Sequence, residues 1–371
     1  AAVTPWQIGD GSGNPVEATG DEQVELFRSV KAGNGRVEIA LTDGGTLSAA
    51  QVNDLSVAGT ANCYVVSAPG TYVFNARVRG NGAGEGVGFE PAIEMADGMT
   101  ADWLWTDSEG LVSGVALDTT SGDIFLTVGE GRGNALVALM QDGKVVWSWH
   151  VWVTDAPQTM TYGNGTVFMD RNLGAAGTTA GGTDAYGMYY QWGRKDPFYG
   201  GEKTETSANA FLEAKNGTVV NPAYPALAFS KSATTTDGAA ANPMTFYNDK
   251  VGTGYNWLAS PNATLWGEAK TLNDPCPPGY RVPGTGAWED LISGRQYIDG
   301  VSVWDGTNYG MTYTHGEQTA WYPAQGYRNY SSGAIVGLRS STGGLGAYWS
   351  AETSSVKSYY LFFRSKLSSS G

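Results

Sequence analysis

The sequence predicts a mainly β protein, and three observations lead to that prediction. Glycine is abundant, at 53 of 371 residues, about twice the usual share of roughly 7%. Several short segments alternate apolar and polar side chains at period two, with Gly, Asn and Asp between them. Apolar residues make up 41% of the chain and charged residues only 16%, which is typical of neither a disordered nor a membrane-spanning chain. Together these features indicate a turn-rich β structure.

Two domains are expected from the length and from an uneven distribution of charge. A chain of 371 residues is long enough for two domains that each bury a core. The formal net charge is −14, and residues 1–155 hold 20 of the 36 acids but only 7 of the 22 bases. By contrast, 18 of the 20 tyrosines follow residue 155. The predicted boundary lies at Asp155-Ala156-Pro157, where proline interrupts a strand ladder, and divides the chain into residues 1–155 and 156–371.

The first domain is predicted to be an antiparallel β-sandwich with Greek-key connections. Its clearest strand is Val145–Val153, which follows the hairpin-turn dipeptide Asp142-Gly143. The odd positions of this strand form one apolar face, and His150 on the other face is expected to be a surface residue. Further strands are expected at Arg36–Thr42, Cys63–Val66, Thr71–Val78, Asp123–Val128 and Leu136–Gln141.

Two acidic turns resemble calcium loops only superficially. They are Asp10-Gly11-Ser12-Gly13-Asn14 and Asp107-Ser108-Glu109-Gly110. Neither has the spaced acids and closing glutamate of an EF-hand, so both are expected to be solvated turns. No metal site is predicted.

Part of the first domain resembles fimbrillin-type surface proteins of Bacteroidales-like bacteria. The resemblance rests on residues 61–72, on Gly80-Asn81-Gly82 and on residues 145–155, and it covers roughly residues 55–155. That family exports its members to the outer surface as lipoproteins, some of which become pilus stalk or tip subunits. The resemblance implies that Cys63 is a buried thiol on a strand. The apolar residues after Cys63 favour the same interpretation.

The second domain resembles the FISUMP-type (major paralogous) domain, which is similar to C-type-lectin-like folds. Four blocks in this order carry the resemblance: residues 167–175, 186–198, 274–283 and 348–350 with 359–363. It implies an α+β, loop-rich domain over most of residues 160–371. Family members continue into a further strand whose cysteine could pair with the equivalent of Cys276. Here the chain ends at Gly371, so we expect either a fragment or a member without that strand.

Local patterns in the second domain favour structural roles. A short helical run is expected at Ala287–Ser293, with Trp288, Leu291 and Ile292 on its core face. The neighbouring opposite charges of Asp170-Arg171 and of Arg194-Lys195-Asp196 favour ion pairing inside the fold over catalysis.

No catalytic site is predicted, and no cofactor is expected. The chain has no metalloprotease, P-loop, nucleophile-elbow or Cys-x-x-Cys motif. The two histidines, His150 and His315, fall in different predicted domains, and Cys276 alone does not match the cysteine pair of formylglycine-generating enzymes. The protein is therefore expected not to be an enzyme, although a polysaccharide-acting enzyme with paired carboxylates stays open as an alternative.

A candidate recognition surface lies between Trp321 and Arg364, a stretch rich in the residue types of adaptable binding surfaces. Trp321, Trp349 and Tyr360 are expected to fill the core, whereas residues 327–330 fit either a core or an exposed loop. The predicted ligand-binding residues are Tyr327, Arg328, Asn329, Tyr330, Arg339, Tyr348, Glu352, Tyr359 and Arg364.

The predicted function is adhesion at the cell surface, in a pilus tip or surface lipoprotein subunit whose second domain binds a host or bacterial glycan or protein. Other pilus subunits are possible partners. Two alternatives are a ligand-binding protein diversified by a retroelement and the enzyme named above. The acidic balance argues against nucleic acid, and no apolar stretch is long enough to span a membrane. Since residues 1–5 lack a basic segment and an apolar one, we expect that a signal peptide has been removed from an extracellular protein.

Overall fold

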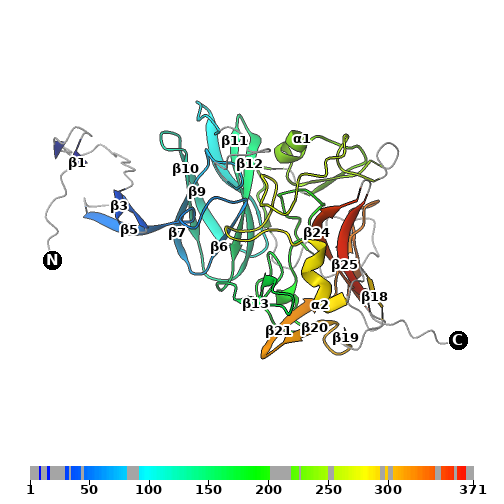
Figure 1. Cartoon of the computed structure of the whole chain (residues 1–371). Coiled ribbons are helices and arrows are strands. Elements are labelled where there is room, and N and C mark those ends of the chain that lie inside the picture. Colours follow the sequence, from blue (N-terminus) through cyan, green and yellow to red (C-terminus); the bar gives the residue numbers. More distant parts are fainter. Residues whose placement is uncertain are drawn as a thin grey trace.

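The chain folds into a mainly β structure with several sheets, as expected. This computed structural model describes residues 8–9, 15–16, 30–32, 35–42, 46–81, 92–200, 219–224, 227–249, 255–292, 297–299, 304–338, 344–354 and 357–364. Figure 1 shows the early strands at one end of the molecule, the cyan and green strands in the middle, and the β24–β25 hairpin toward the other end.

Two large sheets pack face to face in the first part of the chain. One has the order β3 (Val30–Ala32), β4 (Gly35–Thr42), β5 (Thr46–Asp54), β7 (Gly70–Asn75), β10 (Asp123–Val128) and β9 (Val112–Asp118). The other has the order β15 (Val219–Val220), β8 (Met99–Thr106), β11 (Gly133–Gln141), β12 (Lys144–Val153) and β6 (Cys63–Val66). Phe74 of the first sheet and Trp149 of the second meet in the core between them, with ring centroids 5.1 Å apart.

The strand predictions for this region are confirmed in place and largely in length. The β11–β12 hairpin turns at Asp142 and Gly143, whose φ angles of 51° and 75° suit the predicted turn. Cys63 is buried on β6, and burial raises the pKa of its thiol. The pairing is antiparallel except that β5 pairs with β7, and β12 with β6, in parallel. Asp10–Asn14 lies outside the described residues.

Both faces of the second sheet are buried, because the C-terminal half covers its outer face. The core on that side combines Trp105 and Leu136 from the sheet with Phe198, Phe246 and Ile335 from the later chain. The strand β15 also joins the edge of this sheet beside β8. The segments on the two sides of residue 155 therefore share one core.

This shared core corrects the prediction for His150, which is 1% exposed rather than on the surface. The amide nitrogen of Asn134 donates to Asp107 (2.7 Å) and to the carbonyl of Gly174 (2.8 Å). The amide oxygen of Asn134 therefore faces His150 at 2.8 Å and accepts from Nε2. Burial lowers the pKa of His150 to about 3, so the imidazole is neutral at pH 7. Asp107 is likewise a buried acceptor and not part of a solvated turn.

The C-terminal half is built from smaller sheets around short helices. A five-stranded sheet has the order β18 (Tyr297–Asp299), β25 (Ser358–Arg364), β24 (Leu345–Thr353), β22 (Gln325–Arg328) and β23 (Ile335–Leu338). A three-stranded sheet contains β19 (Trp304–Asp305), β20 (Gly310–His315) and β21 (Gln318–Pro323). The two-stranded sheets are β1 (Ile8–Gly9) with β2 (Pro15–Val16), β13 (Thr159–Thr161) with β14 (Val167–Met169), and β16 (Ala228–Ser230) with β17 (Thr245–Tyr247).

The helical segments are short. They are η1 (Thr183–Ala185), α1 (Thr236–Ala241), η3 (Thr285–Trp288) and α2 (Glu289–Ile292). The last two confirm the helical run predicted near Ala287, and Trp288 and Leu291 pack in the core beside Phe363 of β25. The predicted pairings are also present, since Arg171 contacts Asp170 at 2.8 Å and Lys195 contacts Asp196 at 2.5 Å.

Candidate ligand-binding site

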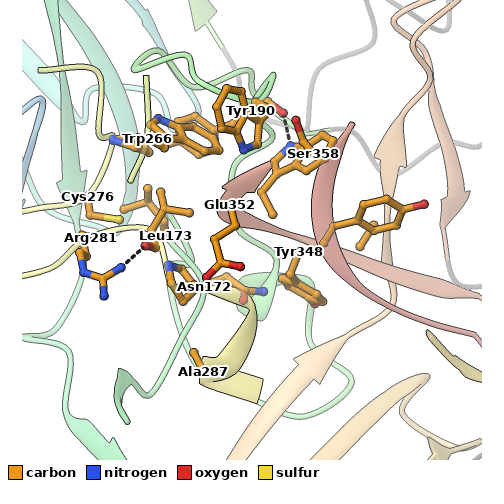
Figure 2. Close-up of a pocket in the computed structure, with 18 of the residues that line it drawn as sticks. Asn172, Leu173, Tyr190, Trp266, Cys276, Arg281, Ala287, Tyr348, Glu352 and Ser358 are labelled. Carbon is orange, nitrogen blue, oxygen red and sulfur yellow. Dashed lines mark hydrogen bonds between the residues drawn. The ribbon is translucent and has the colours of Figure 1, made fainter. Parts of the chain in front are cut away.

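A pocket of about 1420 Å³ opens in the C-terminal half. Its walls come from the β24–β25 hairpin, from η3, from the loop around Cys276 and from the turn after β22. Figure 2 shows Glu352 between the hairpin residue Tyr348, the loop residue Arg281 and the segment that carries Asn172 and Leu173. Segments that are far apart in the sequence therefore meet at one site.

The carboxylate of Glu352 ties the hairpin to the start of η3. It accepts from the backbone N–H of Thr285 at 3.3 Å and from the hydroxyl of the same residue. A Cβ at Gly284 would lie 2.8 Å from Oε1 of Glu352, so glycine permits this close approach. Glu352, one of the predicted ligand-binding residues, lines the pocket, and its carboxylate also fixes the position of the wall formed by η3.

A partly buried lysine, Lys270, organises the loop that forms another wall. Nζ of Lys270 donates to Asp274 (3.0 Å), to the carbonyl of Cys276 (2.7 Å) and to the carbonyl of Tyr280 (2.7 Å). Asp274 also accepts from the backbone N–H groups of Cys276 and Val282. One ammonium group thus binds three oxygen acceptors, and these hydrogen bonds hold the loop in shape.

Three tryptophan side chains of the pocket wall donate their indole N–H groups to backbone carbonyls. Trp257 donates to the carbonyl of Trp192 at 2.7 Å, and Trp192 donates to the carbonyl of Ser350 at 2.8 Å. Trp349 donates to the carbonyl of Tyr190 at 2.8 Å. Because every one of these donors has a backbone acceptor, the rings have fixed orientations. The loop around residue 257 is therefore joined to β24.

All the strongly exposed aromatic side chains in the described part of the chain line this pocket. Seven large apolar side chains are exposed there, and four of them are aromatic. The four are Tyr255 (40% exposed), Tyr330 (51%), Trp349 (36%) and Tyr360 (44%). Exposed apolar area gathered in one place is typical of a binding site rather than of ordinary surface.

Trp349 and Tyr360 face each other across the β24–β25 pair. They are register partners, and their rings meet edge to face at 5.6 Å. Phe362, two residues beyond Tyr360 on the same face, extends this aromatic wall. The expectation that Trp349 and Tyr360 fill the core is therefore wrong.

The neighbouring residues have the opposite orientation, because successive side chains on a strand point to opposite faces. Tyr348 packs with Tyr322 and Phe363, and its hydroxyl donates to the carbonyl of Pro323 at 2.5 Å. Tyr359 is half-buried and does not line the pocket. Trp349 and Tyr360 are thus the exposed members of the two neighbouring aromatic pairs, whereas Tyr348 is half-buried and contributes to the pocket wall from beside them.

Tyr255 and Tyr330 form a second exposed pair, with ring centroids 4.3 Å apart. Tyr330 was predicted as a ligand-binding residue, and the structure places it on the rim of the pocket. Tyr255 was missed. Its φ of 71° is uncommon for any residue but glycine, and an aromatic side chain kept at such a position at a pocket is a sign of function.

The other predicted residues have different surroundings. Tyr327 is half-buried and lines the pocket. Arg328 is buried, and its guanidinium donates to the carbonyls of Gly333 (2.7 Å) and Tyr199, so it positions the turn. Asn329 accepts from the backbone and hydroxyl of Ser331 within that turn. Arg364 is half-buried and is not a pocket residue, and Arg339 lies outside the described residues.

Cys276 also lines the pocket, but it is buried and unpaired, and burial raises the pKa of its thiol well above the ordinary range. In the residues that the structure describes, no group of three or more His, Cys, Asp or Glu side chains could hold a metal ion. No helix in the same residues is long and apolar enough to cross a membrane.

No family model, no curated protein and no solved structure matches this chain.

Proposed function

We propose that this protein is a non-enzymatic adhesion protein and that its pocket binds carbohydrate. One observation carries the proposal: the four exposed aromatic side chains of the described residues all line this one pocket. The flat faces of Trp and Tyr offer apolar area to the C–H faces of a sugar ring, and their polar ends tolerate water. A few polar groups beside such rings can fix the orientation of a ligand.

The pocket wall carries polar groups of that kind. Asn256, next to Tyr255 in the sequence, lines it together with Asn262 and Glu268, and Glu352 lines it from β24 of the hairpin. Amide and carboxylate groups are suitable hydrogen-bond partners for sugar hydroxyls.

The wider assignment follows from the sequence resemblances. In this proposal, residues 1–155 are a fimbrillin-like sandwich and residues 156–371 are a lectin-like binding domain of the FISUMP type. The protein acts outside the cell, as a pilus tip or surface lipoprotein subunit that attaches to a host or bacterial surface glycan. The mixed sheet around β24 and β25, with short helices beside it, is the feature that supports a lectin-like domain.

A glycan array probed with the full chain tests the proposal. We expect binding to at least one carbohydrate, with a large loss in Trp349→Ala and in Tyr330→Ala. Tyr359→Ala is the matched control, because Tyr359 lies on the same hairpin but outside the pocket. Binding that survives both pocket substitutions, or no binding to any glycan, would refute a carbohydrate site. Release of reducing ends from a bound polysaccharide would instead identify an enzyme.

A further inference from the structure

The two exposed aromatic pairs belong to different walls of the same pocket. Tyr255 and Tyr330 come from the loop before Trp257 and from the turn after β22, whereas Trp349 and Tyr360 come from the β24–β25 hairpin. Each pair combines two rings that are tilted or edge to face, so each presents its own separate stacking surface. The pocket therefore offers two places at which a flat apolar face can stack.

The two pairs are held apart by a rigid link. Trp257, two residues after Tyr255, donates its indole N–H to the carbonyl of Trp192, and Trp192 donates to the carbonyl of Ser350, next to Trp349. Trp192 and Trp257 also pack together against Leu265 in a buried cluster. Because buried and fully bonded groups cannot move freely, the separation between the two aromatic pairs is fixed before any ligand binds.

The solvent-facing charges on the pocket wall balance. Glu268 and Glu352 carry negative charge, and Arg281 and Lys357 carry positive charge. Two further charged residues, Asp170 and Arg171, neutralise each other at 2.8 Å. The last, Arg328, is buried on backbone carbonyls. The one positive charge left over is therefore the buried Arg328, and the solvent-facing wall gives no electrostatic preference for an acidic or a basic ligand.

We infer that the pocket binds a linear, uncharged oligosaccharide that stacks one sugar on the Tyr255–Tyr330 pair and a later sugar of the same chain on the Trp349–Tyr360 pair. This inference rests on the proposed function and specifies its ligand. Two stacking sites at a fixed separation make the second contact intramolecular once the first has formed. Affinity therefore rises steeply when the chain becomes long enough to reach both pairs.

The test begins with affinity electrophoresis of the full chain in gels that contain a soluble neutral polysaccharide (a glucan, a mannan, a xylan or a galactan) or an acidic one (polygalacturonate). We expect retardation by at least one neutral polymer and none by polygalacturonate. Calorimetry with the matching oligosaccharides, from monosaccharide to hexasaccharide, should then show a step in affinity of at least about tenfold at one chain length.

Four variants locate the two stacking sites. Tyr330→Ala and Tyr360→Ala should each abolish the step in affinity and leave weak binding that no longer depends on length. Tyr360→Trp should restore the step, because it keeps an aromatic face, and Tyr359→Ala on the same strand should leave it unchanged.

Several results would overturn the inference and leave the proposed function standing. They are preferential binding of polygalacturonate, a monosaccharide that binds as tightly as the hexasaccharide, or glycan-array binding with no neutral polymer bound. If no carbohydrate of any kind binds, the proposed function itself fails.

Discussion

Nζ of Lys195 lies 2.5 Å from Oδ1 of Asp196, and each side chain is only 3% exposed. The ammonium also donates to the hydroxyl of Ser148 (2.7 Å) and to its carbonyl (3.0 Å), and it lies 4.4 Å from the ring centroid of Trp147. The Ser148 hydroxyl donates to the same carboxylate oxygen at 2.6 Å. This ion pair therefore joins the C-terminal half to β12 of the sandwich.

Replacing Lys195 should destabilise the protein strongly. Lys195→Met leaves the carboxylate of Asp196 buried without its cation, and such a change costs about 3–5 kcal/mol. Urea unfolding at pH 7 measures the loss. Arg132→Met is the control, because Arg132 pairs with Asp155 at 2.6 Å but the two side chains are 50% and 60% exposed, so its loss should cost at most about 1 kcal/mol. Equal effects of the two substitutions would contradict this prediction.

The two halves should unfold together. Trp105 and Leu136 share a core with Phe198 and Phe246, and residues 156–371 expressed alone would expose that core. We expect one calorimetric transition for the full chain, and an isolated 156–371 fragment that lacks the near-ultraviolet circular dichroism of packed aromatic rings. Two separate transitions, or a fragment with native spectra, would show that the halves are independent.

Acid should destabilise the protein through His150. The folded pKa of about 3 lies below the ordinary value of 6.5, so between these pH values the unfolded chain binds a proton that the folded chain excludes. The neutral His150 therefore contributes to the free energy of unfolding. This contribution is complete above pH 6.5 and is lost as the pH falls toward 3, by about 1.4 kcal/mol per pH unit. The free energy of unfolding, measured in urea, should therefore fall between pH 7 and pH 4.5 in the unsubstituted protein. In His150→Gln that fall should be smaller by about 2–3 kcal/mol. The same loss in both proteins would exclude this role.

Lys270 should support both stability and ligand binding. Lys270→Met removes three charge-assisted hydrogen bonds. We expect the free energy of unfolding, measured in urea, to fall by about 1.5–3 kcal/mol. Because this loop forms a wall of the pocket, carbohydrate affinity should fall as well. Lys231→Met, at an exposed lysine, should change neither quantity. Unchanged affinity in a destabilised Lys270→Met protein would mean that the loop is not needed for the site.

Tyr255 should show a conflict between stability and binding. Its positive φ is strained for any residue with a Cβ, and a left-handed conformation costs about 1–2 kcal/mol. Tyr255→Gly and Tyr255→Ala both remove the ring and should weaken binding equally. The glycine variant should nevertheless be more stable than the alanine variant by about 1 kcal/mol, as measured by thermal unfolding. Equal stabilities would show that the backbone there is not strained.

Local patterns located the strands of this protein well, because period-two alternation and turn residues act within a few positions. The exact ends of β6 and β10 and the turn at Asp142-Gly143 follow from such patterns. The candidate site was harder to predict. Tyr348 and Trp349 are both aromatic, and so are Tyr359 and Tyr360, so composition alone could not determine which member of each pair faces outward.

The sequence by itself determined that the chain is mainly β, which segments form its main strands, that Cys63 is buried and that Asp196 pairs with one of the two bases before it. These properties depend on residues that lie within a few positions of one another along the chain. Only the tertiary structure decided that His150 is buried and that Trp349 and Tyr360 face a pocket together with Tyr255 and Tyr330. The reason is physical: the exposure of a strand residue depends on what covers each face of its sheet, and here later segments of the chain, from about residue 174 to residue 338, provide that cover.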